Sequence, residues 1–152
     1  MEAVHKELVL YGVEAEDANE AIDKVGNVLY TNGYVRETYV PAVKEREVDY
    51  PTGLQLNTYG VAMPHTAGVH VNTPAICVAK LAKPVIFGHM GEPERKVEAR
   101  ILFMMAIKDP NKQLEMLQSM MGVFTNDEAM LEFDAAKNEQ ELYEVAAKYL
   151  NS

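Results

Sequence analysis

The sequence has a single cysteine and no apolar run that approaches the roughly 20 residues needed to span a bilayer. One cysteine excludes an internal disulfide, and the apolar neighbours of Cys77 predict a buried and unreactive thiol. The first residues also lack the basic and apolar regions of a secretory signal peptide. We therefore expect a cytoplasmic protein that does not insert into a membrane.

Basic residues are scarce as well. The chain has 14 lysines and arginines against 23 aspartates and glutamates, a formal net charge of -9. Such a charge repels phosphate backbones and offers no basic surface, so a nucleic acid is not an expected partner. Acidic residues are in turn absent from residues 50–91, and three of the four histidines, His65, His70 and His89, lie in this stretch. It is the candidate region for binding an anion.

The length of 152 residues fits one compact domain, and we expect residues 1–152 to form it. Hydrophobic residues make up 48% of the chain and charged residues 24%, as in globular domains rather than disordered segments. Strand and helix patterns alternate along the chain, and no repeat or linker interrupts them. The expected fold class is α/β, a single domain with a mixed β-sheet flanked by helices.

Periodicity and capping signals place the individual elements. A first helix is expected from its cap Asp17, with Glu20 as the capping-box partner, to a stop at Asn32-Gly33. The other expected helices cover residues 37–47, 111–123, 126–136 and 138–150, and the last three each open at a capping asparagine. The expected strands cover residues 6–13, 75–81, 85–87 and 97–107, with an extended stretch ending at His65 and a polar loop over residues 88–96.

Several other chemistries lack the residues that they need. His65 and His70 are five residues apart, a spacing that matches no recurrent metal motif. A third metal ligand would have to come from His89, Glu92 or Glu94. No serine lies in a nucleophile motif and the one cysteine is expected to be buried, so a hydrolase is disfavoured. No glycine-rich phosphate loop is present, and we expect no metal and no cofactor.

The segment around His65 has the features of a nucleophilic imidazole. Neutral imidazole is nucleophilic near neutral pH, and phosphoryl transfer needs mainly positioning and charge stabilisation. Pro64 precedes the histidine, and Thr66-Ala67-Gly68 follows as a turn of small residues that can expose backbone N–H donors to phosphate oxygens. Arg46 can supply a bidentate cationic contact, and His70 can donate to the phosphoryl group or fix the tautomer of the first ring.

An ordered set of motifs runs along the chain and comprises Arg46, Tyr50-Pro-Thr-Gly-Leu, Gly60-Val-Ala-Met-Pro-His65, His70 and Lys112-Gln-Leu-Glu-Met-Leu. Together these motifs resemble the enzyme IIA domain of the fructose/mannitol class in the bacterial sugar phosphotransferase system. Within that class the chain is most similar to the galactitol-type branch. The resemblance extends from about the first helix to the C-terminus and implies the fructose/mannitol-type IIA fold.

The resemblance implies a phosphotransferase with a phosphohistidine intermediate. The phosphocarrier protein HPr would donate to His65, through Nε2, and a cognate enzyme IIB would accept the group for uptake of galactitol or a related sugar. Arg46 matches an arginine that stabilises phosphoryl charge, and His70 matches a supporting second histidine of the galactitol-type branch. Gln113 stands about where mannitol-type members have their second active-site histidine, and its amide can donate a hydrogen bond but never a positive charge.

One face would have to bind donor and acceptor in turn, so we expect a small apolar rim around His65. Its candidate members are Val61, Met63, Val69 and Val71, while the methionine cluster is expected mainly to fill the core, through Met104, Met105, Met116, Met120 and Met121. Two alternatives are a regulatory protein that acts through phosphorylated His65 and a non-catalytic interaction domain that has lost phosphorylation. The sugar and the oligomeric state are left open.

Overall fold

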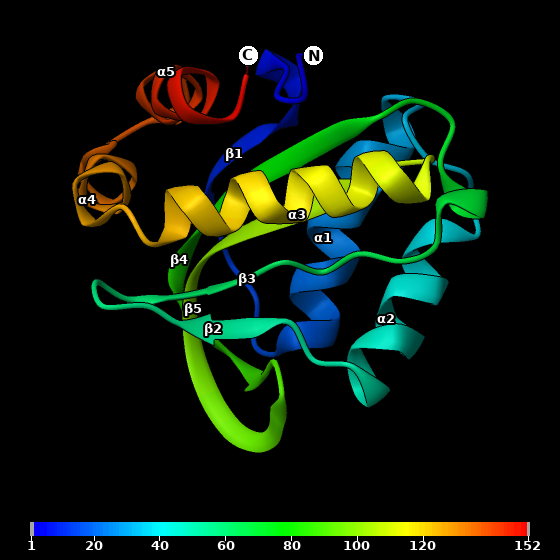
Figure 1. Ribbon diagram of the computed structural model, residues 1–152, viewed down its shortest axis with the longest axis horizontal. Helices are drawn as coiled ribbons and strands as arrows, with labels where there is room; N and C mark the ends of the chain where they lie inside the picture. The colour runs from blue at the N-terminus through cyan, green and yellow to red at the C-terminus, as the bar shows by residue number, and fades with distance from the viewer. Residues whose placement is uncertain (1, 152) are drawn as a thin grey trace.

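A mixed, five-stranded sheet forms the centre of the computed structural model, which describes residues 2–151 (Figure 1). The long strands β4 and β5 form an antiparallel hairpin, β1 runs parallel to β4, and β3 runs parallel to β5. β2 pairs antiparallel with β3 and also meets the end of β4, so the sheet curls back on itself. The strands are β1 (Val9–Val13), β2 (Gly53–Gln55), β3 (Gly60–Ala62), β4 (Ala75–His89) and β5 (Glu92–Ala106).

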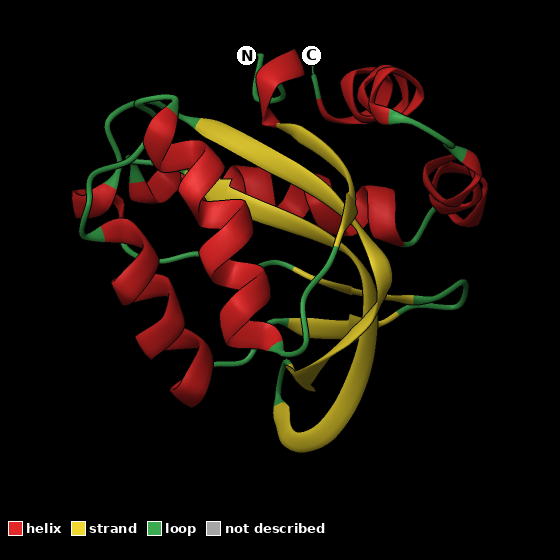
Figure 2. Cartoon of the chain, turned by 180° about the vertical axis from the view of Figure 1, so that it is seen from behind, coloured by secondary structure: helices red, strands yellow, loops and turns green. Residues whose placement is uncertain are grey.

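Helices cover both faces of the sheet. In Figure 1, α3 crosses in front of the strands, with α4 and α5 beside it, and Figure 2 shows α1 and α2 on the opposite face. The helices are α1 (Ala18–Thr31), α2 (Tyr39–Asp49), α3 (Pro110–Phe124), α4 (Asp127–Ala135) and α5 (Glu139–Leu150), with short 3-10 turns at Lys6–Leu8 and Gly68–His70. The expected α/β class, with a mixed sheet flanked by helices, is confirmed.

The central strands are apolar on both faces because each face is covered by helices. Along β4, Cys77 and Ala79 pack in the core formed with α1 and α2, whereas Ile76 and Val78 pack in the core formed with α3, α4 and α5. This alternation follows from the two-residue period of a strand. Burial raises the pKa of the Cys77 thiol to about 12, which agrees with the buried and unreactive thiol predicted from the sequence.

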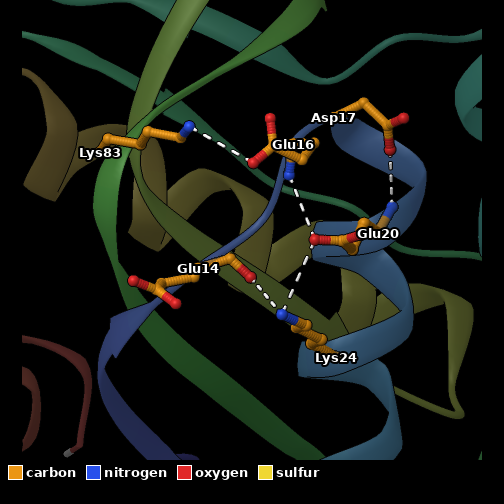
Figure 3. Close-up of polar contacts among 6 residues, drawn as sticks. All are labelled: Glu14, Glu16, Asp17, Glu20, Lys24 and Lys83. Atoms are coloured by element: carbon orange, nitrogen blue, oxygen red, sulfur yellow. Dashed lines mark hydrogen bonds and ion pairs between the residues drawn. The ribbon is translucent and has the colours of Figure 1, made fainter.

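A capping box begins α1 (Figure 3). The Asp17 carboxylate accepts a hydrogen bond from the Glu20 N–H at 2.9 Å, and the Glu20 carboxylate accepts one from the backbone N–H of Glu16 at 3.2 Å. Lys24, one turn further on, pairs with Glu20 at 3.7 Å and donates to the backbone carbonyl of Glu14. The predicted capping box is confirmed, with its reciprocal bond made to the residue before the cap.

The prediction of a polar loop over residues 88–96 is wrong. β4 continues to His89, β5 begins at Glu92, and Gly91 makes the turn between them with a φ of +88°. Residues 91–96 are exposed and therefore show no apolar alternation in the sequence. Backbone pairing with β4 forms this end of the hairpin, an interaction that side-chain patterns do not report.

Other boundaries differ by a few residues. Residues 6–8 form a 3-10 turn, so the first strand begins at Val9, and the second helix spans Tyr39–Asp49 rather than residues 37–47. Asp109, not Asn111, caps α3, and its carboxylate accepts from the Asn111 N–H at 2.8 Å. Within residues 2–151, no helix combines the length and apolar character needed to cross a bilayer.

Candidate active site

His65 lies on the loop that leaves β3, and its side chain is 6% exposed. Its Nδ1 is 2.7 Å from the backbone carbonyl oxygen of Met63. A carbonyl oxygen only accepts hydrogen bonds, so in the neutral ring Nδ1 carries the proton and Nε2 keeps its lone pair. The backbone of Met63 therefore fixes the tautomer, a role that one expectation gave to His70.

The electrostatic setting keeps this imidazole neutral. Burial lowers the pKa of His65 below 6.5, and this effect outweighs the hydrogen bond to Met63, which acts in the opposite direction. The nearby positive charge of Arg46 lowers the pKa further. At neutral pH the ring is thus neutral, and its unprotonated Nε2 has a lone pair of the kind that a base or a nucleophile uses.

His65 and Arg46 line one cavity of about 540 Å³. The end of α2 and the turn that follows it form one side, and the tip of the β4–β5 hairpin and one face of α3 form others. The remaining lining residues are Asp49, Tyr50, Pro51, Thr52, Met63, Met90, Gly91, Pro93, Leu117 and Met121. The wall is therefore mostly apolar, with one arginine and one aspartate among its lining residues.

Arg46 occupies the last turns of α2 and its guanidinium lies over the Tyr50 ring, 5.1 Å from the ring centroid. Within residues 2–151, Arg46 makes no ion pair with an acidic side chain. It also lines an adjoining cavity with Thr66 and Ala67. The structure thus brings Arg46 and His65 together as predicted, and leaves the guanidinium available for an anionic group.

The turn after His65 presents unused backbone donors. In the part of the chain that the structure describes, the N–H groups of Thr66, Ala67 and Gly68 donate to no protein acceptor. The turn packs tightly against the segment between β5 and α3, because a Cβ placed on Gly68 would lie 1.9 Å from the carbonyl oxygen of Lys108. Glycine is required for this close approach, and the predicted set of free N–H donors is present.

Gln113 and His70 support this region without lining the cavity that contains His65. The Gln113 Nε2 donates to the Thr66 carbonyl oxygen at 3.2 Å, so this amide of α3 holds the turn that follows His65. The His70 ring lies on the Gly68–His70 turn, and its Nδ1 is 2.7 Å from the hydroxyl of Thr38. The expectation that either side chain acts on a phosphoryl group stays a prediction.

The apolar rim differs from the expected one. Val61, Met63 and Val71 are buried, and of the four expected members only Val69 is exposed, at 64%. Exposed apolar side chains instead come from Tyr50 after α2 and from α3, through Leu114 and Met121. The expected role of the methionine cluster as core filler is confirmed for three members, the fully buried Met104, Met105 and Met120.

Comparison with known proteins agrees with this arrangement. The sequence model of the family described as "Phosphoenolpyruvate-dependent sugar phosphotransferase system, EIIA 2" matches residues 2–149. The galactitol-specific EIIA component of Escherichia coli K12 is 26% identical over 111 residues, which is 73% of each chain.

Solved structures share the fold. The mannitol-specific cryptic enzyme IIA of Escherichia coli has a TM-score of 0.76 at 20% identity, with 97% of this chain and 96% of that chain covered. The enzyme IIA in the Escherichia coli complex with phosphorylated mannitol enzyme IIB has a TM-score of 0.75 at 23% identity, with 95% and 97% covered. Since the family model spans almost the whole sequence, the chain belongs to the EIIA 2 family of the phosphoenolpyruvate-dependent sugar phosphotransferase system.

Proposed function

We propose that this chain is a phosphoryl carrier that accepts a phosphoryl group from HPr on Nε2 of His65 and passes it to a cognate enzyme IIB. The observation that carries the proposal is the hydrogen bond from Nδ1 to Met63, which leaves Nε2 as the nucleophile beside the free charge of Arg46. The galactitol-specific relative supports galactitol or a related sugar, and the mannitol complex supports enzyme IIB as the acceptor.

In the accepting step, the Nε2 lone pair of His65 forms a bond to phosphorus while the bond between phosphorus and the donor breaks. The Nδ1 proton stays on the ring, hydrogen-bonded to the Met63 carbonyl. Because Nε2 carries no proton, no base is needed to activate it. Arg46 and the free N–H groups of the turn that follows His65 take up negative charge on the phosphoryl oxygens. In the donating step, a nucleophile of enzyme IIB forms a bond to phosphorus while the N–P bond breaks and its electron pair returns to Nε2 of His65.

The proposed function is tested by incubating the purified protein with enzyme I, HPr and phosphoenolpyruvate. We expect a mass gain of one acid-labile phosphoryl group, which peptide mapping places on His65, and its loss when enzyme IIB is added. No gain, with a known enzyme IIA labelled in parallel, would favour a non-catalytic interaction domain. A gain that no enzyme IIB removes would favour a regulatory protein.

The rate of phosphoryl acceptance should fall toward acid pH with a midpoint below 6.5, because burial lowers the pKa of His65 and keeps its ring neutral to lower pH. In the unfolded chain this imidazole takes up a proton near pH 6.5, whereas the folded chain resists it. The neutral, buried ring of His65 therefore stabilises the folded state fully above pH 6.5. This stabilisation is lost as the pH falls through the lowered pKa of the folded state. Initial rates against pH and an NMR titration of the ring check this prediction, which a midpoint above 6.5 would contradict.

A partial defect is expected for His70→Gln. The ring contacts Thr38 and does not line the cavity of His65, so its loss removes one partly exposed hydrogen bond. A bond of that kind contributes about 1 kcal/mol to stability, and if all of it were lost from the transition state the rate would fall by no more than roughly fivefold. The rates of both half-reactions, from HPr and to enzyme IIB, measure the effect. Unchanged rates in both would leave His70 without a part in transfer.

A further inference from the structure

The carboxylate of Glu47 is half-buried next to Arg46 at the end of α2. It accepts two hydrogen bonds from one residue of the following turn. The Thr52 backbone N–H donates to Oε2 at 2.7 Å, and the Thr52 hydroxyl donates to Oε1 at 2.9 Å. Burial raises the pKa of Glu47 to about 7, whereas the Thr52 hydrogen bonds and the charge of Arg46 favour the ionised form. In that form both oxygens accept at once, which a carboxylate provides and an amide does not.

Thr52 extends these contacts to the segment that carries His65. The Met63 N–H donates to both the carbonyl oxygen and the hydroxyl oxygen of Thr52, at 3.3 and 3.2 Å. The Met63 carbonyl in turn accepts the Nδ1–H of His65 at 2.7 Å. A continuous series of hydrogen bonds thus runs from Glu47 through Thr52 and Met63 to the imidazole.

Water cannot readily replace the middle of this series. Thr52 is 2% exposed and Met63 is 1% exposed, so a bond lost between them leaves a buried polar group without a partner. The series also links the two sides of the cavity. Arg46 lies on the helix end that Glu47 anchors, and His65 lies at the other end of the series.

We propose that Glu47 is a positioning residue for phosphoryl transfer, which acts through Thr52 and Met63 to hold the Nδ1–H tautomer of His65 and its distance from Arg46. The inference rests on the proposed function, because positioning has a kinetic meaning only if His65 is the phosphoryl acceptor. Glu47 itself does not line the cavity, so it acts on transfer only through these neighbours. Displacing a reacting group by about 1 Å costs up to roughly 100-fold in rate.

The experiment compares the wild type with Glu47→Gln, Thr52→Val and Thr52→Ser in the HPr assay. The first two variants each remove part of the series and should lower kcat by about 10- to 100-fold, with the KM for HPr changed by less than about twofold. Thr52→Ser keeps the hydroxyl and should retain most of the wild-type rate. Glu144→Gln, the same change on an exposed face of α5, is the matched control.

Nitrogen NMR of the His65 ring supplies a readout that does not depend on transfer. The wild type should show the Nδ1–H tautomer, and Thr52→Val and Glu47→Gln should show a mixture of the two tautomers. Wild-type kcat and an unchanged tautomer in both variants, at a temperature where both are folded, would overturn the proposal. If the wild type accepts no phosphoryl group, the proposed function fails, while the NMR comparison still tests the effect of Glu47 on His65.

Discussion

The variant His65→Gln is expected to accept no phosphoryl group at all. An amide nitrogen has no available lone pair, so the variant lacks the nucleophile, whereas the rest of the cavity is kept. Intact-mass analysis after incubation with enzyme I, HPr and phosphoenolpyruvate measures the effect. His5→Gln is the matched control, because the His5 ring stacks on Tyr34, away from the cavity of His65, and its loss should leave phosphorylation unchanged.

The absence of labelling has to be separated from a loss of folding. His65 is almost fully buried but contributes one hydrogen bond, to the Met63 carbonyl. Its loss costs about 1–3 kcal/mol, which the fold should survive. A thermal melt close to that of the wild type checks this point. Phosphate found on His70 or His89 of the folded variant would contradict the assignment of His65 as the acceptor.

Local signals predicted the helices better than the hairpin. Asp17, Asn126 and Asn138 each cap the helix that the sequence assigned to them, because a cap needs only residues within one turn of it. The end of the hairpin depends instead on backbone pairing between two strands, which the side-chain pattern of either strand does not report. Phe87 pairs with Val97 across the turn, and the exposed residues 91–96 between them carry no apolar signal.

The same limit applies to the candidate site. The residue types and their order pointed to His65 and Arg46, and the structure places both on one cavity. The partner of Nδ1 is the backbone carbonyl of Met63. Every residue has such a carbonyl, so the residue type at position 63 could not predict this hydrogen bond. The part of the cavity wall from Met90 and Pro93 was missed because the hairpin tip had been expected to be a loop.

Arg46→Ala should lower the rate of phosphoryl acceptance by roughly 100- to 1,000-fold while leaving slow labelling of His65, because it removes a preorganised charge and keeps the nucleophile. Arg46→Lys should fall between the alanine variant and the wild type, since an ammonium supplies charge without the bidentate geometry. Single-turnover rates from HPr measure the effect. The control is Arg100→Ala, which removes a guanidinium paired with Asp134 instead of one that lines the cavity.

Comparing the final extent of labelling in His65→Gln and Arg46→Ala separates the roles of the two residues. If Arg46 stabilises charge only in the transition state, its alanine variant reaches full labelling after a long incubation, because a group that lowers only the barrier changes the rate of transfer and leaves its equilibrium unchanged. If His65→Gln and Arg46→Ala both stay unlabelled, the guanidinium is required to bring the donor into place, and HPr docking on the Arg46 variant would then be lost as well.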